Sequence, residues 1–492
     1  MYSYKNIPLA LTLFLLILQS CFSQNKRPPL NTAIPNYTVT IAEENIRKVV
    51  VDASLPLLSD TLYMSQSEFA PLPDGYAAFV HGLEATDAKG QGIKLTTIGK
   101  GIWKVDTHIP STIHLKYSVT IGHDNVQWAT SGAFAKAYVV DNVLFFAGRV
   151  LFIAAAGADS SKIQVRFNLP KGWDVATPYN DIQNDPGTFV ADDLSTLWRN
   201  GSFLGDFERQ EINVGKLKVV IAGTHAMKEG LTLFKSALSK IISSYSSAMG
   251  GAPEGKLVIM GSVSSMPPGG EAFNRSISVS FMQTPGMGNK GRWGYLLSHE
   301  AFHLWNGQAI SPADQSQVEW FVEGFTEYMS KLTAFRTGFI SEAEYLQQLS
   351  QCRNSYLSLG GKVSLVKAGL QKGMNYSLIY DGGMSVALAL DIEIHRSTGN
   401  KKGFINIMRE MYTRYGKTTV PYKYDDIIKV CSEIAGHDLS AFFTAYISGT
   451  QLIPLDKYLG YAGLQASQGG DIQLNANATT AEKDLLKTLL GD

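Results

Sequence analysis

The sequence reads GYLLSHEAFHLWNG over residues 294–307, and this stretch decides how the rest is interpreted. It contains the pattern H-E-x-x-H at His299, Glu300 and His303. On a helix, residues four apart lie one above the other, so both imidazoles can face one metal ion. Glu300 is then placed to take a proton from a water beside the metal. Since the chain has only 9 histidines, two at this spacing favour a metal site over two solvated side chains.

A catalytic zinc site needs a third protein ligand and an open position for water. The segment EWFVEGFTEY, residues 319–328, offers three carboxylates on one helix face: Glu319, Glu323 and Glu327. Carboxylates stacked in this way repel one another unless cations or hydrogen-bond donors lie opposite them. We predict Glu323 as the third ligand of one Zn²⁺ per chain. Glu327 is expected to accept the free N–H of a ligand histidine, and Glu319 to be a solvated or loop-bracing carboxylate.

The pattern of secondary structure changes along the chain. From residue 37 to about 223, short segments alternate apolar and polar residues and are split by turn signals, which is typical of strands. Beyond that point the apolar residues have helical spacing. Helices are expected near residues 226–249, 293–305, 318–337, 341–359, 383–397, 402–415, 424–434 and 439–447.

These patterns predict a multidomain α+β protein. A β-rich N-terminal domain is expected at 37–223 and a mainly helical domain at 224–465. The remaining residues, 466–492, are polar before a short amphipathic end and are expected to form a polar C-terminal tail.

The N-terminus has the features of an export signal. Lys5 precedes an apolar run at residues 7–18, which is too short to span a bilayer. The run ends in LQSC, which resembles a lipobox with lipidation at Cys21, although ordinary cleavage just after it is the alternative. We expect a signal segment at 1–21, a tether at 22–36, and an exported bacterial protein, either an outer-membrane lipoprotein or a periplasmic or secreted one.

Charge and cysteine content narrow the classes of partner. Forty-three basic residues balance forty-three acidic ones, so no nucleic-acid partner is indicated. Cys352 and Cys431 are too few for a disulfide framework; we expect two buried thiols, with a bridge between them as the alternative. The expected partner is a peptide or protein substrate, and a membrane only through a lipid on Cys21. The sequence does not indicate the oligomeric state.

HEAFHLWNG followed by WFVEGFTEY resembles the glycyl aminopeptidase family, metallopeptidase family sixty-one. The likeness extends to GWDVATPYN at 172–180 and GTQLIPLDKYLGYAGL at 449–464. It implies a thermolysin-like zinc-peptidase domain after the β-rich one. The stretch YDGGMSVALALDIEIHRSTGN resembles the family's Y-x-K-G helix, which implies that Tyr380 stabilises the oxyanion. From the residues alone, Tyr380 could equally be a packing aromatic.

The sequence departs from the family at three places. Family members often end with a PDZ domain, for which the residues after 464 are too few, and they tend to carry basic residues where this chain has NGQA at 306–309. The family's amine-recognition motif G-G-x-E corresponds to Gly269, Gly270 and Glu271, with the glutamate one position early. On a strand this shift turns the side chain to the other face, unless a bulge restores it.

We therefore expect a zinc metallopeptidase, with Glu300 as general base and Tyr380 as oxyanion donor. The expected activity is that of an aminopeptidase releasing glycine or alanine, a preference that only the resemblance implies. If Glu271 points away from the site, an endopeptidase of the same fold is the alternative. A non-catalytic, surface-anchored binding protein is a further alternative, but it is disfavoured because every residue needed for the hydrolytic step is present.

Overall fold

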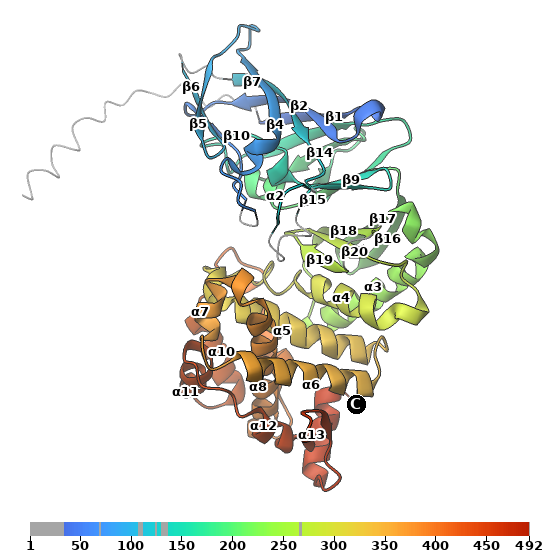
Figure 1. The fold of residues 1–492 in the computed structure, drawn as a ribbon, viewed down its shortest axis with the longest axis vertical. Helices are drawn as coiled ribbons and strands as arrows, with labels where there is room; N and C mark the ends of the chain where they lie inside the picture. The colour runs from blue at the N-terminus through green and yellow to red at the C-terminus, as the bar shows by residue number, and fades with distance from the viewer. Residues whose placement is uncertain are drawn as a thin grey trace, which may run out of the picture.

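The computed structural model describes residues 34–67, 70–106, 112–123, 125–128, 136–264 and 268–491. The expected signal segment with Cys21, and all of the expected tether up to residue 33, lie outside the described residues. Figure 1 shows the β-rich part at one end of the molecule and the helices at the other, which confirms the expected order of a β-rich and a helical part. Within the described ranges, no helix is both long and apolar enough to cross a membrane.

The described residues of the N-terminal part form three sheets. The largest has the strand order β13-β14-β11-β1-β2-β7-β4, and the other two have the orders β10-β3-β6-β5 and β12-β15-β9-β8. Along β1 and β2, buried residues alternate with more exposed ones, as expected for a sheet with one face on a core. The strands are β1 (Asn36–Ile41), β2 (Lys48–Pro56), β3 (Thr61–Tyr63), β4 (Val80–Thr86), β5 (Leu95–Gly99), β6 (Ile102–Val105), β7 (Thr112–Thr120), β8 (Tyr138–Val140), β9 (Val143–Ala147), β10 (Ala154–Ala155), β11 (Ile163–Asn168), β12 (Asp174–Ala176), β13 (Asn180–Asp181), β14 (Thr188–Ala191) and β15 (Gly201–Gly205).

A five-stranded sheet, with the order β16-β17-β18-β20-β19, opens the C-terminal part. Its strands are β16 (Glu208–Val214), β17 (Leu217–Gly223), β18 (Gly255–Val263), β19 (Gly269–Ala272) and β20 (Ser276–Phe281). β17, β18 and β20 are parallel, and α3 (Leu231–Met249) connects the first two. The domain boundary expected after residue 223 is wrong, because β16 and β17 are hydrogen-bonded into this sheet. The alternation of apolar and polar residues predicts that a segment is a strand, but it does not predict which sheet the strand joins.

The two faces of this sheet explain how the parts are joined. One face, with Val219 and Ile259, belongs to the large core formed with the helices. The other face, with Val220 and Met260, shares a smaller core with Phe145 of β9 and with other side chains of the N-terminal part. Apolar burial on both faces therefore ties the β-rich part to the helical one.

The helices begin and end within a few residues of the expected positions. The largest differences are at α3, which begins five residues late, and at α11, which ends four residues early. α4 ends three residues early because the chain turns at His303, which is its C-cap. The capping box of Ser341 and Glu344 is present at the start of α6. The helices are α2 (Leu194–Trp198), α3, α4 (Lys290–Phe302), α5 (Gln315–Arg336), α6 (Glu342–Leu359), α7 (Leu365–Gly369), α8 (Gly383–Thr398), α9 (Phe404–Tyr415), α10 (Tyr424–Ala435), α11 (Ser440–Phe443), α12 (Leu455–Tyr461) and α13 (Thr480–Leu490).

The polar tail expected at 466–492 is wrong, because most of these residues are folded onto the helical part. β21 (Leu464–Ala466) and β22 (Ile472–Leu474) form a hairpin, and α13 follows it. Four leucines of α13 are buried, and Arg336 of α5 donates hydrogen bonds to the carbonyl oxygens of Leu489 and Leu490. The polar residues form the hairpin and its turns, while the amphipathic end packs through its leucines.

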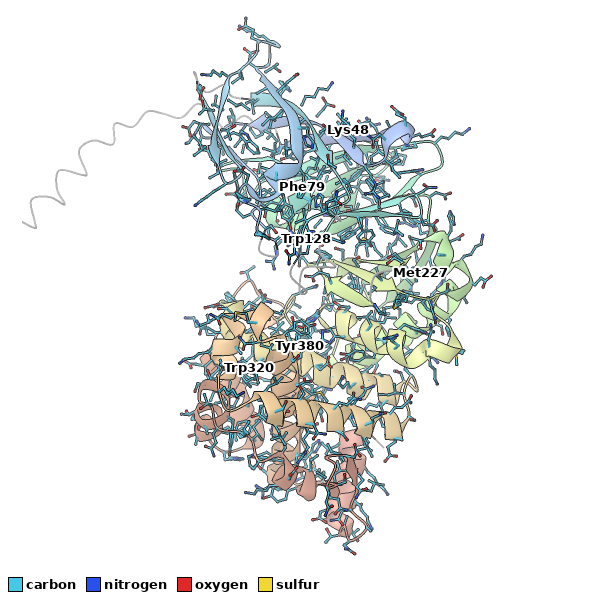
Figure 2. The ribbon with its side chains drawn as sticks, viewed as in Figure 1. Lys48, Phe79, Trp128, Met227, Trp320 and Tyr380 are labelled. Carbon is cyan, nitrogen blue, oxygen red and sulfur yellow. The ribbon has the colours of Figure 1, made fainter. Side chains whose placement is uncertain are left out.

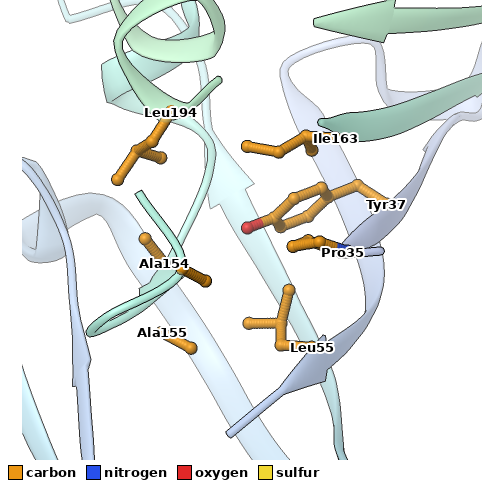
Figure 3. Close-up of a pocket in the computed structure, with 8 residues that line it drawn as sticks. Pro35, Tyr37, Leu55, Ala154, Ala155, Ile163 and Leu194 are labelled. Atoms are coloured by element: carbon orange, nitrogen blue, oxygen red, sulfur yellow. The ribbon is translucent and has the colours of Figure 1, made fainter. Parts of the chain in front are cut away.

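Two smaller features of the core are a cavity and a pair of cysteines. A cavity of about 10 Å³ in the N-terminal part, shown in Figure 3, is lined mainly by apolar side chains such as Leu55 and Leu194. A cavity of this size has room for one water at most and none for a substrate. Tyr37, at its wall, already donates its hydroxyl hydrogen to the carbonyl oxygen of Ile153.

Cys352 and Cys431 are free, buried thiols, which confirms the expectation that they are unpaired.

Candidate metal centre

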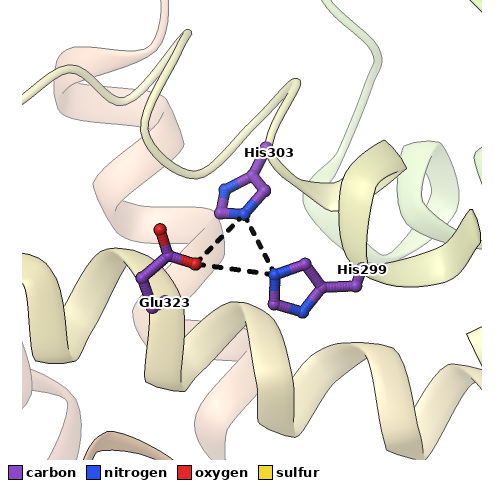
Figure 4. Close-up of side chains that lie close together, drawn as sticks. All are labelled: His299, His303 and Glu323. Carbon is purple, nitrogen blue, oxygen red and sulfur yellow. Dashed lines mark hydrogen bonds and ion pairs between the residues drawn. The ribbon is translucent and has the colours of Figure 1, made fainter. Parts of the chain in front are cut away.

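Helices α4 and α5 pack together and carry three side chains whose ligand atoms converge, as Figure 4 shows. The Nε2 atoms of His299 and His303 lie 3.2 Å apart. Oε2 of Glu323 lies 3.5 Å from the first of these nitrogens and 3.4 Å from the second. All three side chains are buried. The structure thus brings together the three residues that the sequence predicts as ligands.

The hydrogen bonds of the two imidazoles fix which nitrogen faces the centre. His299 Nδ1 lies 3.1 Å from Oε2 of Glu327, and His303 Nδ1 lies 3.1 Å from the carbonyl oxygen of Asn306. Because both partners accept hydrogen bonds, Nδ1 of each imidazole is the donor, and Nε2 of each ring faces the centre. The buried Oε2 of Glu323 has no hydrogen-bond partner in the described part of the chain.

This donor set fits a metal ion. One ligand atom from each of the three side chains converges on the centre, and two histidines with one glutamate are a set that catalytic zinc uses. Burial lowers the pKa of His299, but the nearby carboxylates of Glu323 and Glu327 outweigh it and raise that pKa to about 10. The centre therefore favours a positive charge between the side chains, which a bound metal supplies in place of a proton.

Glu327 is fixed by more partners than the histidine alone. Lys331, one turn further along α5, places its Nζ 2.5 Å from Oε1 of Glu327, and the hydroxyl of Tyr295 donates to Oε2. Burial opposes the charge on Glu327, but the charge of Lys331 and the bond from His299 hold its pKa well below the usual range. The sequence analysis missed Tyr295 and Lys331, although each lies four residues from a predicted site residue on the same helix face.

The loop after α4 is built from the residues that depart from the family pattern. The side-chain nitrogen of Asn306 donates to the carbonyl oxygens of Phe321 and Val322, at 3.0 and 3.1 Å. Because the carbonyl of Asn306 also accepts from His303, this buried asparagine links a ligand histidine to α5 beside Glu323. NGQA therefore forms a bracing loop where basic residues are usual in the family.

Glu300 lies outside the group of three converging ligands and faces β19. A Cβ atom at Gly270 would lie 2.8 Å from Cγ of Glu300, so only glycine allows the strand to approach the carboxylate this closely. Gly269 begins the strand opposite Ser280 of β20. Glu300 is buried, and burial raises its pKa. Glu300 therefore lies beside the centre without belonging to its ligands, where its carboxylate can accept and donate a proton.

Glu271 follows Gly270 on the same strand. β19 pairs with β20 in a regular register, with Glu271 opposite Ser278, so the bulge considered from the sequence is not found in β19. Nevertheless, burial and the negative charge of Glu300 raise the pKa of Glu271 to about 8. Its carboxyl group therefore lies within electrostatic range of the centre.

Tyr380 lies in a π-helical turn at residues 378–382, immediately before α8. Its ring stacks on that of His299, with centroids 5.8 Å apart and an interplanar angle of 13°. Figure 2 shows Tyr380 at the end of the helical part that faces the N-terminal part. Burial and the charge of Glu323 raise the pKa of Tyr380 well above its usual value, so the phenol stays protonated as a donor.

Tyr376 is a neighbour that no sequence pattern indicates. Its ring stacks on Tyr380 with centroids 4.1 Å apart, while 41% of the residue is exposed.

Glu319 was expected to be either a solvated or a loop-bracing carboxylate, and it is not solvated, because it is only 7% exposed. It accepts a hydrogen bond from Lys372 and so braces the loop after α7.

The fold and the centre together are those of a metallopeptidase, in which a β-rich part precedes a helical part with an H-E-x-x-H helix. Residues 36–199 match the sequence model of the peptidase M61 N-terminal domain, and residues 293–367 match that of the M61 glycyl aminopeptidase. The chain is thus a peptidase that resembles the M61 glycyl aminopeptidases in both its parts, as the sequence analysis expects. No curated protein matches it in sequence.

Solved structures share this fold. An aminopeptidase N family protein from Idiomarina loihiensis has a TM-score of 0.75 and 20% identity, over 88% of this chain and 79% of that chain. An M1 zinc metallopeptidase from Deinococcus radiodurans has a TM-score of 0.56 and 13% identity, over 86% of this chain and 94% of that chain. A mutant of an M1 zinc metallopeptidase from the same organism, bound to the substrate Tyr-Ser-Ala, has a TM-score of 0.57 and 14% identity, over 86% and 94% of the two chains.

Proposed function

We propose that this metallopeptidase is an aminopeptidase that uses one zinc ion to release glycine or alanine from the N-terminus of a peptide or protein. His299, His303 and Glu323 would hold the zinc. The observation that carries the proposal is the convergence of their three ligand atoms next to the buried, non-ligating Glu300. The resemblance to glycyl aminopeptidases supports the choice of small residues.

When bound, zinc supplies Lewis-acid chemistry by polarising the scissile carbonyl and acidifying water. Glu300 acts as the general base that takes the proton of the attacking water and then delivers it to the leaving amine. The raised pKa of Glu300 favours the second of these transfers. Glu327 and Asn306 hold the two imidazoles in the orientation that leaves both Nε2 atoms available.

Tyr380 donates its phenol hydrogen to the oxyanion that forms on the scissile carbonyl. The stacked rings of His299 and Tyr376 restrict the position of this phenol, and its raised pKa keeps the proton in place. A preorganised donor of this kind typically stabilises the transition state by about 2.7–4 kcal/mol.

Glu271 binds the α-ammonium group of the substrate and so selects free N-termini. A carboxyl group whose pKa is raised by burial and by a neighbouring negative charge gains from pairing with a cation. Gly270 lets the edge strand β19, which begins at Gly269, approach Glu300 closely, and Glu271 follows on the same strand.

Free-amine and N-acetylated versions of Gly- and Ala-initiated peptides test this specificity. We expect acetylation to reduce kcat/KM at least 100-fold, and Glu271→Gln to raise KM for the free-amine peptides. The exposed Glu229 offers the matched control, since Glu229→Gln should leave both values unchanged. Equal turnover of acetylated and free peptides would contradict the aminopeptidase and favour the endopeptidase. Zinc binding without turnover of any peptide in a broad library would favour the non-catalytic binding protein.

Export is a separate part of the proposal and rests on the N-terminal sequence. Lipidation at Cys21 would place the enzyme on the bacterial outer membrane, whereas ordinary cleavage would release it into the periplasm or the medium. Cell fractionation of the wild type and Cys21→Ser distinguishes these cases. We expect the wild type in the membrane fraction and the variant in a soluble exported fraction. Recovery of the wild type in the cytoplasm would contradict export.

A further inference from the structure

The two carboxylate oxygens of Glu323 have different surroundings. Oε2 faces the Nε2 atoms of the two histidines and has no hydrogen-bond partner in the described part of the chain. Oε1 points the other way and lies 2.6 Å from Nζ of Lys372. One oxygen is therefore free for a metal ion, while the other is occupied by a lysine.

Lys372 lies between two carboxylates on successive turns of α5. Its Nζ is 2.9 Å from Oε2 of Glu319 as well as 2.6 Å from Glu323, and its side chain is only 26% exposed. Oε1 of Glu319 in turn accepts from Gln315, at 3.2 Å.

The backbone allows this lysine to reach α5 because α7 ends in a glycine. A Cβ atom at Gly369 would lie 2.0 Å from the carbonyl oxygen of Ser316, at the start of α5. The chain of α7 therefore runs directly against α5, and Lys372 follows three residues later. No part of this arrangement is visible in the H-E-x-x-H motif or in the segment that carries Glu323.

We propose that Lys372 is a positioning residue for the metal centre, which holds Glu323 so that a single oxygen, Oε2, is presented to the ion. The inference rests on the proposed zinc site and adds a residue that acts through Glu323 without touching the metal. Its charge also offsets that of Glu319, which would otherwise repel Glu323 across one helical turn in a buried setting. Removing Lys372 frees Oε1 to turn toward the ion or toward water.

The test compares zinc affinity, measured by competition with a chromophoric chelator, in the wild type, Lys372→Gln, Glu319→Gln and Lys367→Gln. Partners that orient metal ligands typically contribute about 10–100-fold to affinity. We expect a loss of about that size for Lys372→Gln. Glu319→Gln retains the Lys372–Glu323 contact, and the exposed Lys367 lies five residues from Lys372. Both of these variants should stay within about threefold of the wild type.

A second measurement reports the ligand geometry directly. In the cobalt-substituted protein, the visible spectrum depends on the coordination of the ion, and we expect it to change in Lys372→Gln but not in Glu319→Gln. If Lys372→Gln does not fold, the double variant Lys372→Gln/Glu319→Gln, which removes both charges, is measured in its place. The same loss of zinc affinity and the same change in the cobalt spectrum are expected of it. The inference is overturned if Lys372→Gln binds zinc as well as the wild type, or if Glu319→Gln loses as much affinity. A wild type that binds no zinc would overturn the proposed function as well.

Discussion

At the scale of single residues, each metal-facing side chain is fixed by a second group. Glu327 and Asn306 each accept from one histidine, and Lys372 donates to Glu323. Two of these second groups are themselves held in place, Glu327 by Lys331 and Lys372 by Glu319. The ligand atoms are thus oriented before any ion binds, which lowers the cost of forming the centre.

The role of Tyr380 gives a prediction at this scale. Tyr380→Phe keeps the ring that stacks on His299 but removes the phenol donor. We expect kcat to fall by about 10²–10³-fold with little change in KM, because the lost hydrogen bond forms only in the transition state. Steady-state kinetics and zinc content measured together check this, with Tyr461→Phe on α12 as the control. An unchanged kcat would assign Tyr380 to packing.

How much of the centre could be predicted depends on whether one helix or several supply the residues. His299 and Glu300 lie in α4 and His303 is its C-cap, while Glu323 and Glu327 share α5, so helical periodicity relates the residues within each of these two sets. Lys372 and Tyr376 come from a loop whose path depends on the contact of Gly369 with α5, and no local pattern encodes that contact. The direction of the Glu271 side chain is hard to predict for another reason: its motif is shifted by one residue on a strand, where successive side chains point to opposite faces.

At the scale of elements, a close contact between α5 and α8 at the site is made by two glycines. A Cβ atom at Gly324 would lie 2.3 Å from Cα of Gly383, at the start of α8, and a Cβ at Gly383 would lie 2.1 Å from the carbonyl oxygen of Trp320. Gly324 follows Glu323, and Gly383 follows the turn that carries Tyr380. This contact therefore sets the separation between a predicted ligand and the predicted oxyanion donor.

Gly324→Ala tests the importance of that separation. Alanine is favoured over glycine in helices by about 1 kcal/mol, but here the added methyl group would overlap a backbone that cannot move locally. We expect the free energy of unfolding to fall by about 1–3 kcal/mol and activity to fall with it. Gly460→Ala on α12 is the matched control, because a Cβ there meets nothing within 4 Å. Denaturant titration should show this control unchanged or slightly stabilised.

Helices were predicted more accurately than the grouping of strands. Helical spacing and the Ser341–Glu344 capping box are local signals, so most helix bounds follow from neighbouring residues. β16 and β17 have the same alternation as the strands before them, and only their hydrogen bonds assign them to the second sheet. The domain boundary was therefore placed too late.

At the scale of the whole molecule, one apolar core joins the two parts and a second set of apolar contacts completes the helical part. The shared core beneath β9 and β18 joins the N-terminal part to the site-bearing part. At the opposite end, α13 packs its leucines near α8 and α12, and Arg336 satisfies its last carbonyl groups. Figure 1 shows α13 at the end of the molecule far from the β-rich part. The C-terminal residues thus complete the helical part.

Leu489→Ala distinguishes a docked helix from the polar tail expected from the sequence. Leu489 is 5% exposed, and truncating a buried leucine typically costs about 2–5 kcal/mol. We expect a lower melting temperature by scanning calorimetry. Leu474→Ala, at a leucine that is 55% exposed in β22, should have almost no effect. Equal melting temperatures for the two variants would contradict the packing of α13.

The central claim is that His299, His303 and Glu323 hold a zinc ion beside a catalytic base. The most direct measurement is zinc content together with peptidase activity in the wild type and in Glu300→Gln. Because Glu300 lies outside the ligand set, we predict one zinc per chain in both proteins. Activity should be present in the wild type and reduced by at least about 10²-fold in the variant. Full activity in zinc-loaded Glu300→Gln, or no zinc in the wild type, would contradict the account.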